Sequence, residues 1–257
     1  IVNERDLTSS GTNDRFSHSG LIHSILRTSD DGGQGGGQRY SYINFNIRNV
    51  HYYGNMAMGQ GGSLLPGLPK GKLDISGCTF HGNVTGGGGG GFLGSRGIYA
   101  GGILRVRDCH AYGDVVAGDA GGITGSLLGS WGVNYDISHC SLTGNVNGSS
   151  AGGIAGTRME VGSGSERGIS YCSHTGGNIN GVNAGGIAGS NGGGSISNCF
   201  STGDINGQNS GGIVGREFGA TKSAYGTVYN KYGEILNCYS TGNINGNNTG
   251  GIAGSQC

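Results

Sequence analysis

One unit recurs along this chain, and its spacing restricts the fold more than any other feature. The stretches "ISNCFSTGDINGQNSGGIVG" (196–215) and "ILNCYSTGNINGNNTGGIAG" (235–254) keep cysteine, glycine and isoleucine at the same offsets. A seventh, degenerate copy precedes six clear ones and has Val50 in the place of cysteine. Repeats of this length predict an architecture of stacked units. The six cysteines that anchor the clear copies are 31, 31, 32, 27 and 39 residues apart: Cys78, Cys109, Cys140, Cys172, Cys199 and Cys238.

Each copy follows the same internal order. Ile or Val stands three residues before the cysteine, Gly stands four residues after it, and a β-branched residue and Gly-Gly-Ile follow. Short apolar runs bounded by Gly and Asn are typical of strands and turns. In the degenerate copy, Gly61-Gly62 takes the Gly-Gly position one residue early, and in the second copy 87–100 is interpreted as an insert before Gly-Gly-Ile. We assign Gly-Gly-Ile to 101–103, 121–123, 152–154, 185–187, 211–213 and 250–252.

These units predict an all-β protein, because one unit of 27–39 residues cannot bury its own apolar face whereas stacked units can. We expect a parallel β-helix, or β-solenoid, of about seven coils over 46–257, with 1–45 as an N-terminal cap or exchanged segment. A propeller is disfavoured because each blade needs four strands. The 62 glycines fit sharp corners and closely spaced backbone layers.

The pattern "NCYSTGNINGNNTGGIAG" (237–254) resembles the glycine-rich GLUG repeats of large secreted bacterial surface proteins, among them adhesin-like and peptidase-associated chains. The resemblance covers about 75–254. It implies a right-handed parallel β-helix on a cell surface and transfers no catalytic residue. The first 45 residues and the long inserts depart from the pattern.

The cysteines are predicted to form one column, with neighbours about 4.8 Å apart. That spacing suits a disulfide, so bridges Cys78–Cys109, Cys140–Cys172 and Cys199–Cys238 are one interpretation. A column of buried free thiols is the other. Cys257 lies outside the repeat register and is a candidate for pairing with another chain. No short Cys-x2–4-Cys pair is present, so we expect neither zinc nor another cofactor.

Composition and sequons bear on the location and the partners. Charged residues make up 12% of the chain and the formal net charge is zero, which argues against nucleic acid or an anionic membrane as a partner. No apolar run is long enough for a membrane span. Asn83, Asn147 and Asn247 open glycosylation sequons, and together with the cysteines they favour an extracellular setting. Because the chain begins Ile-Val-Asn, we interpret it as a mature or partial chain.

No catalytic residues are predicted. Asp114 and Asp204 share an offset from their cysteines but lie three coils, or about 14 Å, apart, which exceeds the separation of catalytic carboxylate pairs. Because Asn fills that position in other copies, we expect a hydrogen-bonded row of Asn and Asp. A threonine row that binds ice is a weaker interpretation than strand-favouring residues, since His81 and Tyr112 interrupt it. The row consists of Thr143, Thr175, Thr202 and Thr241.

The inserts and the ends indicate how the chain associates. Aromatic residues and Arg, which anchor interfaces, gather in the inserts. An uncapped solenoid end is expected to add further copies and form an open filament. We therefore predict a self-associating structural subunit of an extracellular fibre or cell-surface appendage. The alternative is an adhesin segment that binds carbohydrate or another cell surface, and a polysaccharide-active enzyme is the third hypothesis. The interface candidates are Trp131, Arg158, Arg216, Phe218, Tyr225, Tyr229 and Tyr232.

Overall fold

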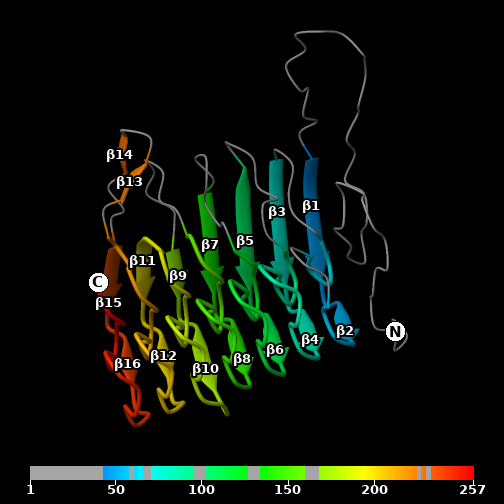
Figure 1. Cartoon of the computed structure of the whole chain (residues 1–257). Helices are drawn as coiled ribbons and strands as arrows, with labels where there is room; N and C mark the ends of the chain where they lie inside the picture. The colour runs from blue at the N-terminus through cyan, green and yellow to red at the C-terminus, as the bar shows by residue number, and fades with distance from the viewer. Residues whose placement is uncertain are drawn as a thin grey trace, which may run out of the picture.

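The chain folds into stacked layers of short strands (Figure 1). The computed structural model describes residues 43–57, 61–65, 71–94, 102–126, 134–159, 168–220, 222–224, 227–229 and 233–257. Two parallel sheets of seven strands each run along the stack. The first sheet contains, in spatial order, β1 (Ile43–Arg48), β3 (Gly71–Ser76), β5 (Ile103–Arg107), β7 (Asn134–Ser138), β9 (Gly168–Ser170), β11 (Gly194–Ser197) and β15 (Gly233–Leu236). The second contains β2 (His51–Tyr53), β4 (Thr79–His81), β6 (His110–Tyr112), β8 (Ser141–Thr143), β10 (Ser173–Thr175), β12 (Phe200–Ser201) and β16 (Tyr239–Ser240).

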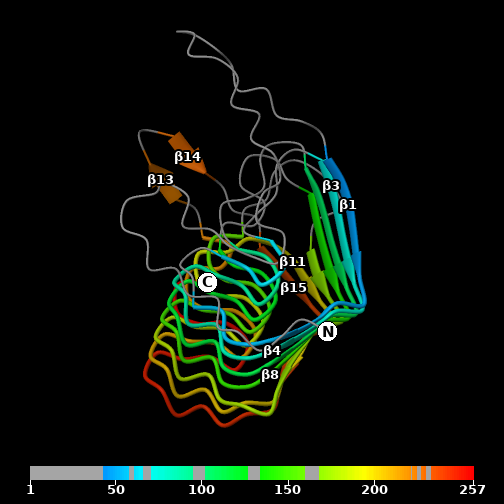
Figure 2. The ribbon, with the colours of Figure 1, turned by 90° about the vertical axis from the view of Figure 1, so that its right-hand side faces the viewer.

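The rest of each layer closes the turn through single parallel bridges. One row of bridges joins Val or Ile residues such as Val115 and Val146, and another joins glycines such as Gly121 and Gly152. Viewed along the stack, the chain follows nearly the same path in every layer (Figure 2). The predicted parallel β-solenoid is confirmed, and its first strand begins at Ile43, inside the segment that was expected to be a cap.

Two assignments within the repeat were wrong. Gly90 pairs with Gly62 on one side and with Gly121 on the other, so the second layer has Gly90-Gly91-Phe92 where later layers have Gly-Gly-Ile. Ile103 instead opens β5, where it pairs with Lys72 and Asn134. The insert of this layer therefore follows the glycine pair, as it does in later layers. In the first layer Gly62, and not Gly61, pairs with Gly90 and so occupies the first position of the glycine pair.

The glycine pair is required by the closeness of the backbone. A Cβ added to Gly152 would lie 2.0 Å from the carbonyl oxygen of Ala155 in the same turn. A Cβ added to Gly153 would lie 2.1 Å from the carbonyl oxygen of Gly186 in the next layer. No side chain fits at these distances, so the two glycines permit both the corner and the stacking.

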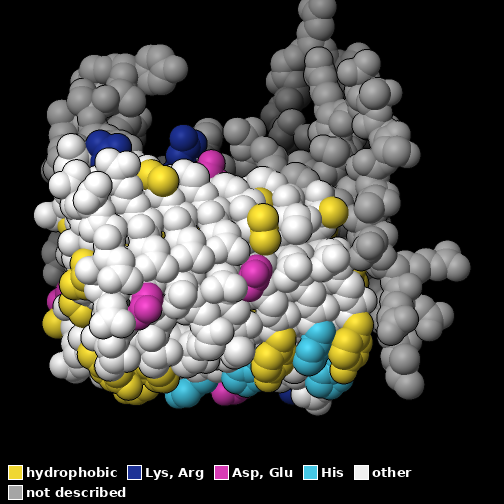
Figure 3. Space-filling model, turned by 60° about the horizontal axis from the view of Figure 1, so that its bottom comes forward, with side chains coloured by type: hydrophobic (Ala, Val, Ile, Leu, Met, Phe, Trp, Pro, Cys, Tyr) yellow, Lys and Arg dark blue, Asp and Glu magenta, His cyan; other side chains and the backbone are white. Residues whose placement is uncertain are grey.

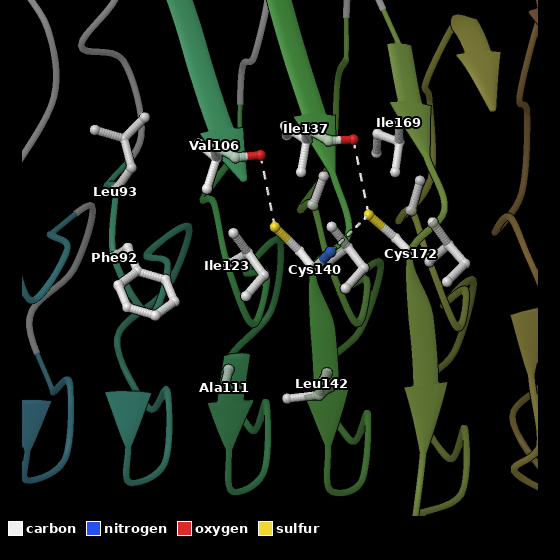
Figure 4. Close-up of a cluster of buried hydrophobic side chains, with 14 of the residues drawn as sticks. Phe92, Leu93, Val106, Ala111, Ile123, Ile137, Cys140, Leu142, Ile169 and Cys172 are labelled. Atoms are coloured by element: carbon white, nitrogen blue, oxygen red, sulfur yellow. Dashed lines mark hydrogen bonds between the residues drawn. The ribbon is translucent and has the colours of Figure 1, made fainter. Parts of the chain in front are cut away.

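The core consists of apolar side chains that lie over their counterparts in the adjacent layers (Figure 4). Val106, Ile137 and Ile169 form one fully buried column, and Ala111 and Leu142 belong to another. This burial is the main favourable term in folding. The described residues contain no helix, and hence none that could span a membrane.

One element was missed in the sequence. The insert at 216–233 contains a two-stranded antiparallel sheet of β13 (Lys222–Ala224) and β14 (Thr227–Tyr229). Ala224 pairs with Thr227. The sequence signal was one-sided: Gly226 precedes a run of Thr, Val and Tyr, whereas Lys222–Ala224 contains no residue that is typical of strands.

Candidate functional surfaces

The cysteine column is part of the core. Five of its members are buried and Cys238 is half-buried. The Sγ of Cys140 lies 3.6 Å from the carbonyl oxygen of Val106 in the preceding layer, and the backbone N–H of Cys140 donates to the Sγ of Cys172 at 3.4 Å (Figure 4). Burial raises the pKa of both thiols well above the usual range. All seven cysteines are free thiols in this structure, so the alternative of bridges between layers is not formed.

The predicted row of Asn and Asp is confirmed as a hydrogen-bonded ladder. In each of the first six layers the Oδ1 atom accepts the backbone N–H of the equivalent residue in the next layer, at 2.8–3.1 Å. Asp114 and Asp204 also accept the side-chain amide of the following Asn at 3.1 Å. The two carboxylates therefore have a structural role. The ladder consists of Asn55, Asn83, Asp114, Asn145, Asn178, Asp204 and Asn243.

The sequon asparagines differ in their surroundings. Asn83 belongs to the ladder, where its Oδ1 atom accepts the N–H of Asp114. Asn147 begins a second, exposed row in which each side-chain amide donates to the Oδ1 atom of the preceding layer at 2.8 Å. Asn247 is exposed in the last layer. Glycosylation of the three residues stays a prediction.

The outward face of the second sheet carries no Asp, Glu, Lys or Arg in its strands. In its first three layers, His81 is stacked between Tyr53 and Tyr112, with ring centroids 4.6 and 4.7 Å apart. Figure 3 shows histidine and hydrophobic side chains gathered on this part of the surface. Thr143 and Thr175 continue the same column, with their hydroxyl oxygens 3.5 Å apart. The column is thus an aromatic stack followed by threonines.

The outward face of the first sheet carries ion pairs in its second to fourth layers. Lys72 forms an ion pair with Asp74 at 2.9 Å, and Arg107 in β5 forms one with Asp136 in β7. The hydrogen bond to Asp136 raises the pKa of Arg107. In β9 and β11 the outward positions hold only Gly and Ser. Arg48 in β1 and Glu234 in β15 also occupy outward positions, so among the seven strands of this sheet only β9 and β11 lack a charged side chain on this face.

Beside the Arg107–Asp136 pair lies an open hollow of about 460 Å³. It is formed by three consecutive layers, at the corner where the first sheet passes into the second. Sequence reasoning did not single out this site. Its lining combines both members of the ion pair with Asp108, Ser138, His139, Ser170 and Tyr171.

The interface candidates are only partly described. Arg158 is exposed, and the guanidinium of Arg216 binds Gln256 and Glu217. Phe218 is 5% exposed and packs in the core, so it is not the surface group that the sequence indicated. Cys257 is exposed, and its Sγ accepts the backbone N–H of Phe218 at 3.3 Å. Trp131, Tyr225, Tyr232 and the side chain of Tyr229 lie outside the described residues.

Nothing in the described residues points to a catalytic function. They contain no group of three His, Cys, Asp or Glu side chains that could hold a metal ion. The carboxylates tested above are bound in the ladder, and His174 is enclosed in the core.

The fold and its columns define a β-solenoid repeat protein, which fits a repeat-type surface or structural protein. The family model described as the GLUG motif matches residues 180–206, which run from the fifth layer into the sixth. The resemblance found in the sequence is confirmed at these residues. Comparisons with curated proteins and with solved structures gave no match.

Proposed function

We propose that the chain is a structural subunit of an extracellular fibre or cell-surface appendage, in which copies stack end to end. The observation that carries this proposal is the uncovered face of the layer formed by β15 and β16. Tyr239 and Ile244 are each 53% exposed there, whereas Ile205, the counterpart of Ile244 in the preceding layer, is fully buried. An added layer would bury this apolar surface, which favours association.

The polar groups of this layer support the same assembly. Asn243 and Asn245 donate to Asp204 and Asn206 in the preceding layer. Within the described residues, no layer donates to their own Oδ1 atoms. A further layer would supply such donors, because every earlier step of the ladder uses the same contact. An unpaired strand edge of this kind favours the addition of another strand.

An extracellular location is supported by features of the surface. Asn247 presents its sequon from an exposed position. A separate feature supports the stacking of copies: the formal net charge is zero and few side chains are charged, so electrostatic repulsion between stacked copies is small.

The proposal is tested by imaging the purified 257-residue chain with negative-stain electron microscopy, together with sedimentation velocity. We expect filaments with an axial repeat of about 34 Å, which corresponds to seven layers at about 4.8 Å. Ile244→Lys places a charge on the open layer and should leave dispersed subunits. The matched control is Val182→Lys, at a lateral position that is 43% exposed, and it should still give filaments.

Dispersed wild-type protein at all concentrations would contradict the fibre proposal and favour an adhesin segment. The outward face of the second sheet, whose strands carry tyrosines, histidines and threonines but no Asp, Glu, Lys or Arg, is the observation that favours this second function. Such a segment would bind immobilised carbohydrate or cells as a monomer.

A further inference from the structure

The corner between the two sheets has one backbone conformation in all seven layers, but three layers place a residue other than Asn or Gly there. In each layer one corner residue has a left-handed backbone, with φ between 51° and 63°. Asn and Gly adopt this conformation readily, and they occupy the corner in four layers. The third, fourth and fifth layers have Asp108, His139 and Tyr171 there instead, at φ of 53°, 54° and 53°. The corner residues of the other layers are Asn49, Gly77, Asn198 and Asn237.

Tyrosine at this corner is unfavourable on local grounds. A left-handed conformation is unfavourable for a bulky residue, because its Cβ comes close to the following carbonyl oxygen. Residues held in such conformations cluster at functional sites. Since Asn198 and Asn237 show that asparagine is compatible with the corner, folding alone does not require Tyr171 or His139.

The three corner residues that are neither Asn nor Gly lie together on the hollow described above, and Tyr171 is the one for which a left-handed backbone is unusual. Asp108, His139 and Tyr171 line it from consecutive layers, beside the Arg107–Asp136 ion pair. The rings of His139 and Tyr171 are stacked, with centroids 5.0 Å apart and an interplanar angle of 8°. Tyr171 is 58% exposed. The hollow therefore offers an accessible aromatic side chain next to a row of polar groups.

The polar groups can bind a ligand that carries many hydroxyl groups. Asp108 and Asp136 provide carboxylate acceptors, Arg107 provides N–H donors, and the hydroxyls of Ser138 and Ser170 can do both. Hydrogen bonds to charged groups are the stronger ones. The lining has two carboxylates, Asp108 and Asp136, against the single guanidinium of Arg107, so acidic groups outnumber basic ones. That excess of acidic groups disfavours anionic ligands such as uronates or phosphates.

From this combination we infer that the hollow is a binding site for a neutral glycan, with Tyr171 packing against the C–H groups of a sugar ring. The carboxylates and Arg107 bind its hydroxyls. The three layers span two strand spacings, or about 10 Å, so the site takes a short oligosaccharide segment aligned with the stack. This site is independent of end-to-end assembly, and it would decorate the side of a fibre or serve a single subunit equally.

The test uses the whole chain and a panel of soluble oligosaccharides, measured by saturation-transfer NMR and titration calorimetry. The neutral probes are cello-, manno- and N-acetylated chito-oligosaccharides, and the anionic comparator is oligogalacturonate. We expect at least one neutral probe to bind with a Kd of about 1 mM or tighter. Tyr171→Asn should weaken that binding at least about tenfold.

Tyr171→Asn installs the residue that other layers use at this corner, so the urea midpoint should not fall. The matched control is Tyr112→Thr, which installs the residue that Thr143 provides in the next layer and should leave binding unchanged. The inference is overturned if no neutral probe binds, if oligogalacturonate is preferred, or if Tyr171→Asn binds as the wild type does. Loss of binding in Tyr112→Thr alone would also overturn it and move the site to the second sheet.

Discussion

His174 makes the stability of the fifth layer depend on pH. Its ring is fully buried, and the Nε2 atom lies 2.8 Å from the carbonyl oxygen of Gly144. A carbonyl only accepts, so Nε2 carries the hydrogen, and in the neutral ring Nδ1 accepts from the hydroxyl of Ser201 at 3.0 Å. Both nitrogens are thus satisfied without a charge. Burial lowers the pKa of His174 below its ordinary value.

The direction of the effect follows from the two pKa values. In the unfolded chain this histidine titrates near about 6.5. Because the folded pKa is lower, the unfolded state binds the proton first as the pH falls. Stability that is fully present at neutral pH is therefore lost below about pH 6.5, at up to about 1.4 kcal/mol per unit, until the folded pKa is reached. By about pH 5 the loss reaches at most about 2 kcal/mol.

The comparison of wild type with His174→Leu isolates this contribution. Leucine fits because Leu142 occupies the paired position in the preceding layer. Urea unfolding followed by far-UV circular dichroism, at about pH 7.5 and about pH 5, should show the wild type losing up to about 2 kcal/mol more than the variant. At neutral pH the variant should be less stable by about 1–3 kcal/mol, since the carbonyl of Gly144 loses its partner. Equal losses in the two proteins on acidification would refute the reasoning.

Three further outcomes are expected. Ellman's reagent should modify Cys257 first and the half-buried Cys238 next, and the other five thiols should react only in denaturant. A total below seven reactive thiols in denaturant would contradict the free-thiol column. Asn145→Ala should cost about 1–3 kcal/mol in urea unfolding because it leaves a ladder N–H without its acceptor, whereas Asn147→Ala in the exposed row should stay within about 0.5 kcal/mol. Gly152→Ala should prevent folding or lower stability by more than about 4 kcal/mol, judged by circular dichroism, whereas Gly87→Ala, with its nearest atom 4.0 Å away, should be tolerated.

The stacked fold could be predicted from the sequence because each column repeats at a fixed offset. Cysteine, the branched residue after it and the ladder position recur with almost no change in spacing, so the buried columns and the Asn/Asp ladder followed directly. Parallel pairing in register places equal offsets over one another. The same property made Asp114 and Asp204 recognisable as members of a structural row.

The errors occurred where residue identity and offset disagree. In the second layer Phe92 replaces isoleucine within a run of glycines, and the nearest Gly-Gly-Ile lies further along the chain. The fixed offset was the better guide, since Gly90 follows Cys78 by 12 residues, as Gly121 follows Cys109. Phe218 lies in an insert, where no repeated position indicates burial.

The glycan site was missed for a different reason. Its corner residues are the exceptions in a column that is otherwise Asn and Gly, and that contrast was present in the sequence. The sequence alone does not show that the corner lies beside Arg107 and Asp136. The hollow depends on the side chains of three layers together.

Because neighbouring layers meet through the same contacts at almost every step, duplication of one unit in the gene would lengthen the molecule without a new core having to evolve. Each duplication would add about 4.8 Å, and each loss would remove as much. The gain or loss of a unit is least tolerated next to the fifth layer, because His174 hydrogen-bonds to Gly144 in the preceding layer and to Ser201 in the following layer. We expect length variants of this protein to gain or lose units on either side of that layer and to retain the layer itself.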